Sequence, residues 1–258
     1  MIKNRGKRQL IDYMEDRFGN RCDDRQSIAD IFGAFYRDLY APKVHYDAYV
    51  IGCCEGIPLF TREEIRCALK SLKSGKCADS NGVLAEMLKA GGDQLVTVLL
   101  HVFNKIVTGT FEPPDMWAKS VITVLFKSGA PHLPENHRPV TILLLLYKLF
   151  ARLLYLRLAP LLDREQSSAQ AGFRIGFSTI DHLWTISHII EKAEEWNINL
   201  WVAAVDYRKA FDSIEHQSIW RALKKQGVPV GYIKLLSKLY DGQSVNSALA
   251  GSADHFQS

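Results

Sequence analysis

Asp206 is the residue whose setting in this sequence most favours chemistry, and a second aspartate, Asp212, follows six residues later. Asp206 follows the apolar run 200–205, which is typical of a buried strand. A buried carboxylate without a partner is costly, so this side chain must be solvated, hydrogen-bonded or bound to a cation. Two interpretations stay open, because aspartate favours the turn after a strand, and its oxygens, beside a backbone carbonyl, also suit Mg²⁺. We expect Asp212 to cap or support the helix that follows.

The composition is that of an ordinary globular protein. Of the 258 residues, 47% are hydrophobic and 23% are charged, which is enough for one large domain or two small ones. The net charge of +4 is compatible with a nucleic-acid partner, but many proteins without one share it. The five cysteines lack C-x2-C spacing, so neither a disulfide framework nor a zinc site is expected. We therefore predict an intracellular protein, nuclear or cytoplasmic, without a disulfide partner.

No signal for export or membrane insertion is recognisable. The first ten residues are basic, but Asp12, Glu15 and Asp16 follow them where a secretory signal would have an apolar segment. The longest apolar run, 142–147, is too short to cross a bilayer. The sequence thus predicts a protein that is neither secreted nor transmembrane and has no membrane partner.

Apolar periodicity and turn residues divide the chain into helices and strands. Helices are predicted over 27–39, 61–75, 93–109, 144–162, 179–196, 217–226 and 230–240, and strands over 120–126, near Val140 and over 200–205. The first two strands should pair like a hairpin around a basic loop. A linker is predicted over 41–60, where Pro and Gly occur without a period. This order of elements predicts an α+β fold.

Start signals mark two of these helices. Thr61 and Glu64 form a capping box, and Phe60 and Ile65 occupy the two staple positions around it. Asp93 is the expected cap of the next helix.

The helix predicted over 179–196 has one apolar face. Leu183, Ile186, Ile189 and Ile190 fall on it at helical spacing. We expect this face to point into the core.

Five motifs stand in a characteristic order along the chain. They are NHRP at 136–139 within the stretch 117–158, QAGFR at 170–174, STIDH at 178–182, DYRKAFD at 206–212 and ALKKQGVPVGYIKLL at 222–236. Together they resemble the reverse transcriptase of non-LTR retrotransposons, the LINE-type elements, in an RTE-like form. Residues 68–92 also resemble the segment that precedes the polymerase core in these transposable elements. The resemblance covers roughly residues 61–250, and the ordered series of motifs is highly specific.

The resemblance implies a right-hand polymerase fold, present here as fingers and part of the palm. Residues 1–60 would form an N-terminal helix and linker, 61–198 a fingers-like region, and 199–258 a partial palm with the first catalytic aspartate motif. The family carries two adjacent aspartates on a later palm hairpin, and that motif is not found in this sequence. We therefore expect a truncated polymerase domain that stops before the catalytic Asp-Asp hairpin.

The resemblance also implies roles for single residues. Asp206 would be catalytic and would bind Mg²⁺ together with the carbonyl of Tyr207, in a two-metal nucleotidyl transfer. Phe211 would pack under the sugar and select deoxynucleotides. Lys127 and Arg138 would bind the incoming nucleotide, since ammonium and guanidinium groups suit phosphate and Arg also stacks on bases.

The residues that the resemblance places on the template or other nucleic acid are Gln170, Gly172, Phe173 and Arg174. Each implied role has a structural alternative. The QAGFR residues could form a turn with Gly172 as its permissive position. Phe211 could be a core residue, and Arg138 a solvated surface charge.

The function implied is that of a fragment of a retrotransposon RNA-directed DNA polymerase. The intact parent would use an RNA template, a DNA primer, dNTPs and Mg²⁺. This chain is expected to be inactive by itself, because a single aspartate holds two metal ions poorly. The alternatives are a non-catalytic nucleic-acid-binding module and a pseudogene product without function. An unpaired edge of the strand over 200–205 would also make the isolated chain poorly soluble.

Overall fold

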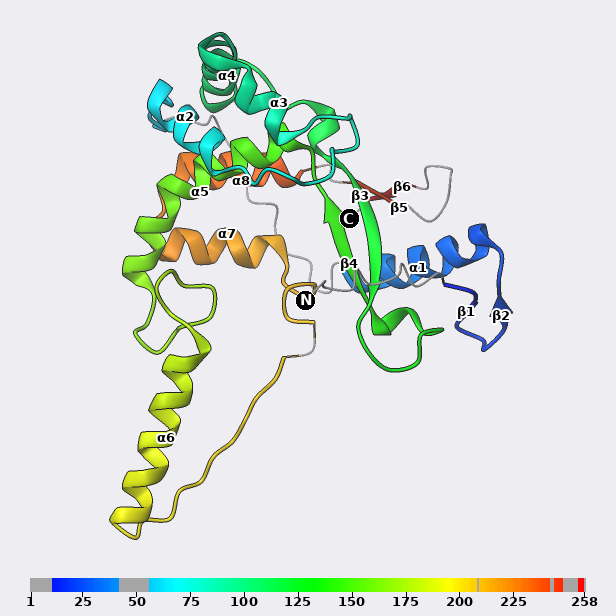
Figure 1. Ribbon diagram of the computed structural model, residues 1–258, viewed down its shortest axis with the longest axis vertical. Coiled ribbons are helices and arrows are strands. Elements are labelled where there is room, and N and C mark those ends of the chain that lie inside the picture. The colour runs from blue at the N-terminus through cyan, green and yellow to red at the C-terminus, as the bar shows by residue number, and fades with distance from the viewer. Residues whose placement is uncertain (1–10, 42–55, 208, 242–243, 248–254, 258) are drawn as a thin grey trace.

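The computed structural model describes residues 11–41, 56–207, 209–241, 244–247 and 255–257, the last two ranges by their backbone only. Its helices are α1 (Arg25–Tyr40), α2 (Arg62–Ser71), α3 (Ala85–Ala90), α4 (Gly92–Val107), α5 (Leu145–Glu165), α6 (Thr179–Glu195), α7 (His216–Lys225) and α8 (Val230–Tyr240). Its strands are β1 (Met14–Glu15), β2 (Arg21–Cys22), β3 (Lys119–Phe126), β4 (His137–Ile142), β5 (Ser244–Ser247) and β6 (His255–Gln257). Two 3-10 turns, η1 (Asp115–Trp117) and η2 (Pro134–Asn136), precede β3 and β4. Figure 1 shows most helices gathered on one side of the β3–β4 hairpin.

The sheets contain the predicted hairpin. β3 and β4 are antiparallel, with Val121 opposite Ile142 and Phe126 opposite His137. β5 adds to β3 in parallel, which gives the order β4-β3-β5-β6, and β1–β2 is a separate small sheet. The mixture of helices and strands agrees with the α+β class. The division into fingers and palm stays a prediction, and the linker predicted over 41–60 lies largely outside the described residues.

The larger core lies between α2, α4, α5 and α8. Ile65 of α2, Phe103 of α4, Phe150 of α5 and Leu235 of α8 are each 0–1% exposed. The apolar stripes of these helices face one another, and full burial of each such side chain contributes about 1.5–3 kcal/mol relative to exposure. This core holds together α2, α4, α5 and α8, which come from distant parts of the chain.

The start signals of α2 and α4 had different outcomes. The capping box of α2 is confirmed, since the Thr61 hydroxyl accepts from the Glu64 N–H at 3.2 Å and the Glu64 carboxylate accepts from the Thr61 N–H at 2.8 Å. The cap predicted at Asp93 is wrong, because α4 starts one residue earlier, with Gly91 as its N-cap. The Asp93 carboxylate instead pairs with Arg66 at 2.7 Å. An acidic residue in the first turn still complements the helix dipole there.

A second, smaller core joins α1 to the β3–β4 hairpin. Met14, Ile28, Phe32 and Tyr36 form it. The Phe32 ring meets the His137 ring edge to face, with centroids 5.1 Å apart. α1 therefore covers one face of the hairpin, as Figure 1 also shows.

Within the described ranges, none of the helices has the length and apolar character needed to span a membrane. Cys22, Cys67 and Cys77 are free thiols. Cys53 and Cys54 lie outside the described residues.

His137 should make the stability of the fold depend on pH. Its ring is 4% exposed, and burial lowers its pKa, although the carbonyl of Leu133 lies 3.1 Å from Nδ1. The unfolded chain then takes up this proton at a higher pH, near 6.5, than the folded chain does. Stability is full above that pH and is lost as the pH falls below it. We expect the free energy of unfolding to drop by at most about 1.4 kcal/mol per pH unit from this group.

Urea denaturation at pH 7.5, 6.5 and 5.5 measures this dependence. His137→Gln should flatten the slope, because the replacement does not titrate. His101→Gln, on the exposed side of α4, is the matched control and should leave the slope as it is. Equal slopes for wild type and His137→Gln would contradict the prediction.

The strand predicted over 200–205 is not formed. Residues 199–207 carry no secondary structure, and Trp201, Val202 and Val205 are 93%, 72% and 76% exposed. The residue types favour a strand, but a strand also needs a hydrogen-bonded neighbour and a surface to pack on. None of the strands in the described ranges pairs with this segment.

The apolar face predicted on α6 is not buried either. The helix itself is confirmed, but Leu183, Ile186, Ile189 and Ile190 are 42–62% exposed. α6 extends away from the other helices (Figure 1). Helical spacing predicts which residues share a face, but burial of that face requires a second element against it.

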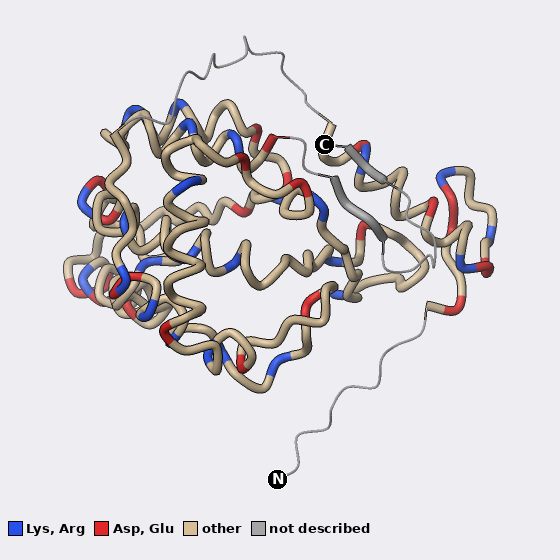
Figure 2. The backbone as a smooth tube through the Cα atoms, turned by 90° about the horizontal axis from the view of Figure 1, so that it is seen from above, with Lys and Arg blue, Asp and Glu red and all other residues tan. Residues whose placement is uncertain are grey.

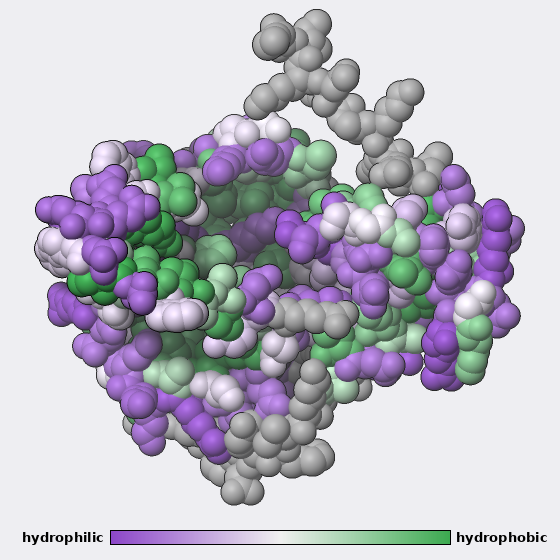
Figure 3. All heavy atoms as spheres, turned by 90° about the horizontal axis from the view of Figure 1, so that it is seen from below, coloured by the Kyte–Doolittle hydropathy of each residue, from purple (hydrophilic) through white to green (hydrophobic). Residues whose placement is uncertain are grey.

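This exposed surface should make the chain self-associate. α6 and residues 196–205 together expose several tryptophan and aliphatic side chains, and Figure 3 shows hydrophobic residues around a hollow on the face seen from below. Sedimentation velocity should show a mass that rises with protein concentration. Trp184→Glu combined with Ile190→Glu should reduce this rise, whereas Met87→Glu on α3 should not. A monomer at every concentration would contradict the expectation.

Candidate active site

The chain has no secondary structure before Asp206 and forms a compact turn shortly after it. Asp206 and Tyr207 are exposed, at the end of the unpaired stretch 199–207. A compact turn follows, in which the Lys209 carbonyl accepts from the N–H groups of Asp212 at 3.0 Å and Ser213 at 3.1 Å. Lys209 adopts a left-handed backbone with φ of 51°. The carboxylate of Asp206 is thus accessible from solvent rather than buried.

α1 contacts this turn from far along the chain. The Tyr40 hydroxyl donates to the Asp212 carboxylate at 3.4 Å, and the Lys209 ammonium lies 4.1 Å from the centre of the Phe35 ring. Burial and the charge of Asp212 raise the pKa of Tyr40 to about 12. Of the two roles expected for Asp212, to cap or to support the helix that follows, the capping role is wrong, since Glu215 is the N-cap of α7 and no side chain caps it. Asp212 supports the packing of α1 instead.

Two of the predicted site motifs meet in space. The Phe173 and Phe211 rings pack edge to face with their centroids 5.4 Å apart. These side chains are 93% and 76% exposed, so Phe211 is not a core residue. The QAGFR stretch and the DYRKAFD stretch, which begins at Asp206, therefore meet at one exposed aromatic pair.

The QAGFR stretch is a turn, as its structural alternative predicts. The Gln170 side chain donates to the Gly172 carbonyl at 3.1 Å, and Arg174 pairs with Asp163 of α5 at 2.8 Å. The left-handed position of this turn is Phe173, with φ of 61°, and not Gly172. A bulky residue in that region is unfavourable and is often found at functional sites.

Lys127 and Arg138 lie together on the open face of the β3–β4 hairpin. The Lys127 N–H donates to the Asn136 carbonyl at 2.9 Å, and Arg138 is opposite Leu125. Side chains alternate along strands, so Leu125, Lys127 and Arg138 share one face, and His137 points to the other, toward α1. Both basic side chains are exposed. Among the described residues, no hydrogen bond or ion pair joins them to Asp206.

Comparison with known proteins identifies the family. A sequence profile described as "Reverse transcriptase (RNA-dependent DNA polymerase)" matches residues 126–254, which is half of the chain. The chain belongs to the reverse transcriptase family. The matched residues include Arg138, Phe173, Asp206 and Phe211.

Curated relatives of this reverse transcriptase come from transposable elements. The "Retrovirus-related Pol polyprotein from type-1 retrotransposable element R2" of Popillia japonica is 32% identical over 66% of this chain and 23% of its own length. The "Probable RNA-directed DNA polymerase from transposon BS" of Drosophila melanogaster is 30% identical over 63% of this chain and 18% of its own length. The "Transposon TX1 uncharacterized 149 kDa protein" of Xenopus laevis is 26% identical over 91% of this chain and 19% of its own length. The resemblance to non-LTR retrotransposon reverse transcriptases is confirmed, and the chain spans about a fifth of the length of these relatives.

Reverse transcriptases use divalent metal ions, so the site can be judged as a metal centre. Asp206 and the Tyr207 carbonyl offer hard oxygen ligands, which suit Mg²⁺. In the described part of the chain, no three His, Cys, Asp or Glu side chains converge as a metal site would require. The donor type fits, but the number of ligands does not complete a two-ion centre. Asp206 can supply part of one coordination shell.

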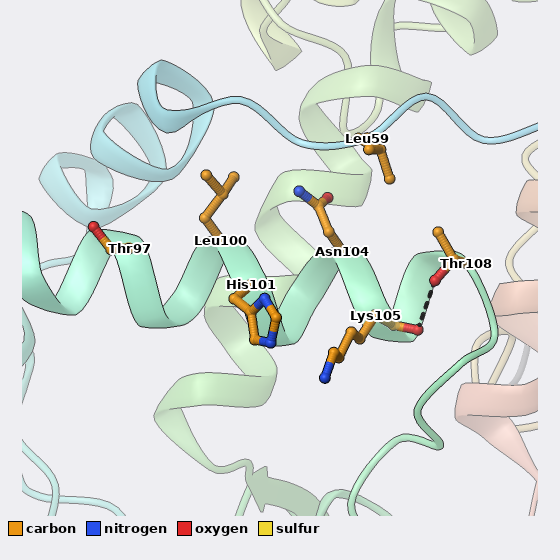
Figure 4. A pocket seen from close by; sticks show the side chains of 7 residues that line it. All are labelled: Leu59, Thr97, Leu100, His101, Asn104, Lys105 and Thr108. Atoms are coloured by element: carbon orange, nitrogen blue, oxygen red, sulfur yellow. Dashed lines mark hydrogen bonds between the residues drawn. The ribbon is translucent and has the colours of Figure 1, made fainter.

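A groove of the reverse transcriptase lies elsewhere, on α4. Its volume is about 410 Å³, and its lining residues are Leu59, Thr97, Leu100, His101, Asn104, Lys105 and Thr108. Figure 4 shows these side chains along one side of the helix, with Leu59 above them. None of them belongs to the predicted site.

Asp79 is a residue whose importance the motifs did not indicate. Its carboxylate accepts from the Leu145 N–H at 2.8 Å, at the start of α5, and from the Val83 N–H at 2.9 Å. Burial by itself would raise the pKa of Asp79, but these backbone donors outweigh it and lower the pKa. Asp79 thus fixes the first turn of α5 from a distant loop. The polar, turn-forming residues around Asp79 were the only indication in the sequence that its side chain would bind backbone N–H groups.

Proposed function

We propose that this chain carries the nucleotide-binding part of an RNA-directed DNA polymerase of a non-LTR retrotransposon. It would act on an RNA template, a DNA primer and dNTPs, with Mg²⁺ as cofactor. The observations that carry the proposal are the exposed Asp206 carboxylate and the exposed Phe173–Phe211 ring pair, which both lie within the residues that match the family. An exposed carboxylate can hold a metal-bound nucleotide, and exposed aromatic rings can pack on its sugar or base.

The roles proposed for the residues follow from their chemistry. Asp206 and the Tyr207 carbonyl would hold Mg²⁺, which, when bound, supplies charge for activating the primer hydroxyl and stabilising pyrophosphate. Phe211 would lie under the nucleotide sugar, and Phe173 would extend its aromatic surface. Lys127 would contact phosphate as a point charge. Gln170, Gly172 and Arg174 would contact nucleic acid from the adjoining turn.

Primer extension tests the catalytic role. We expect no extension of oligo(dT) on poly(rA) by the purified 258-residue chain with Mg²⁺ and dTTP, because Asp206 alone holds two metal ions poorly. Asp206→Asn is the control. Extension by wild type that disappears in this variant would show that the carboxylate set is complete and would refute the expected inactivity. Extension by both would refute the role of Asp206.

A second candidate is a nucleic-acid-binding module without catalysis. The exposed Lys127 and Arg138 on the open hairpin face favour it. Figure 2 shows Lys and Arg interspersed with Asp and Glu over the molecule, so the distribution of charge by itself marks no binding face. Binding by this chain at low salt, with weaker binding in Arg138→Ala and no primer extension, would favour this candidate over the polymerase.

Binding of an RNA–DNA duplex should depend on Arg138. Arg138→Ala should weaken binding about tenfold at low salt, since one charge-assisted phosphate contact is lost. It should also reduce the salt slope of log K by about one. Fluorescence anisotropy between 50 and 200 mM salt measures both, and Lys105→Ala on α4 is the charge-matched control. No binding by wild type at low salt would refute both candidate functions.

A further inference from the structure

The position of Asp206 has little support from the residues before it. Residues 199–205 carry no secondary structure, and their side chains are exposed. Among the described residues that follow Tyr207, the turn 209–213 is the first folded segment. Within the described part of the chain, the nearest folded support for Asp206 therefore lies on its C-terminal side.

α1 provides that anchor at two points. The Lys209 ammonium sits over the Phe35 ring, and the Tyr40 hydroxyl donates to Asp212. Phe35 and Tyr40 are five residues apart on α1, and the two turn residues are three apart, so the contacts fix both the place and the orientation of the turn. The left-handed backbone of Lys209 carries a steric cost that such contacts can offset.

An unpaired hydroxyl lies beside the same contact. Tyr36 is 6% exposed, and within the described residues its hydroxyl has no hydrogen-bond partner. Burial raises the pKa of Tyr36, and the charges of Tyr40 and Asp212 add to the effect. The Tyr36 ring stacks on the Tyr40 ring with centroids 6.0 Å apart, so it lies beside the residue that contacts Asp212. Buried hydroxyls without partners are unusual, so the Tyr36 hydroxyl is a feature of this junction that packing alone does not explain.

We propose that α1 is the positioning element of the Asp206 segment, with Phe35 and Tyr40 as positioning residues that act through Lys209 and Asp212. The contact itself does not depend on the proposed function, but its consequence for metal binding at Asp206 rests on it. A metal ligand must be held within a fraction of an ångström of its productive position, and a turn locked three residues away limits its range. Residues far outside the family motifs thereby control the motif that carries Asp206.

Limited trypsin cleavage after Lys209 tests the anchor. Trypsin must take the Lys209 side chain into its specificity pocket, so the ammonium must leave Phe35 before the bond is cut. In EDTA, Phe35→Leu and Tyr40→Phe should each speed this cleavage about fivefold, the effect of losing one weak polar contact. Cleavage after Lys76, in an exposed loop, is the internal reference and should not change.

The pairing of Tyr40 with Asp212 has its own signature. Asp212→Ala should speed cleavage as Tyr40→Phe does, and the two together should add nothing further. Asp212→Asn keeps an acceptor and should stay near the wild-type rate. Unchanged cleavage after Lys209 in Phe35→Leu and Tyr40→Phe would overturn the proposal. A rise at Lys76 as well would also overturn it, because it would show general unfolding.

Mn²⁺ separates the anchor from the proposed function. If Asp206 binds the ion, Mn²⁺ should slow cleavage after Lys209 in wild type but not in Asp206→Asn. Tyr40→Phe should then raise the Mn²⁺ concentration for half protection about fivefold, with the melting temperature unchanged. Absence of protection in wild type would refute metal binding at Asp206, while the cleavage rates in EDTA would still decide the anchor.

Discussion

Arg157→Ala is expected to lower the free energy of unfolding by about 3 kcal/mol, because it breaks a mostly buried ion pair and several hydrogen bonds at once. The Arg157 side chain is 15% exposed and binds Glu64 through two parallel hydrogen bonds of 2.7 and 2.9 Å. It also donates to the carbonyls of Pro58 and Leu59 and lies over the Phe60 ring. One guanidinium thus joins α5 to the start of α2 and to residues 58–60, which precede that helix.

Urea denaturation at low protein concentration measures the loss. Arg152→Ala, an exposed arginine on the same helix, should change stability by less than about 0.5 kcal/mol. Arg157→Lys should recover less than half of the loss, because an ammonium keeps the charge but not the planar fork. The hydrogen bond from Arg157 also lowers the pKa of Glu64, so that pKa should rise in Arg157→Ala. A loss below about 1 kcal/mol would show that this pair contributes as an exposed one does.

Phe150→Ala is expected to lower the free energy of unfolding by about 4 kcal/mol, through lost burial and the cavity left behind. Phe150 is fully buried, and its ring meets those of Phe60, Phe103 and Trp117 at centroid distances of 5.9, 5.1 and 5.4 Å. These neighbours come from different parts of the chain, so they cannot close together over a smaller side chain without moving whole helices. Such a loss is a large part of the total stability of a domain, about 5–15 kcal/mol.

The control for Phe150 lies on the same helix. Tyr155 is 43% exposed, and Tyr155→Ala should cost less than about 1 kcal/mol. Phe150→Leu should give an intermediate loss, because it leaves a smaller cavity. Equal effects of Phe150→Ala and Tyr155→Ala in the same urea series would contradict the central place of Phe150 in the larger core.

The sequence predicted which residues belong to the candidate site, but not which of them are in contact. The ordered motifs identified the family, and they placed Asp206 and Phe211 among the residues to examine. They did not show that Phe173 would meet Phe211, or that Tyr40 would reach Asp212, 172 residues away. The functional roles of these residues stay predictions that the assays above decide.

The sequence by itself determined the elements whose signals are local. The capping box at Thr61 and the apolar stripes predicted α2 and the other long helices, and alternating β-branched residues predicted the β3–β4 hairpin, since neighbouring residues complete these hydrogen bonds. Only the tertiary structure decided which apolar surfaces are covered. Residues 200–205 and α6 have the composition of buried elements and are nevertheless exposed. Burial requires contact with a segment that is distant in the sequence. Arg157 makes such a contact with residues 58–64, and α1 makes one with the turn 209–213, but no local pattern specifies which distant segment will be in contact.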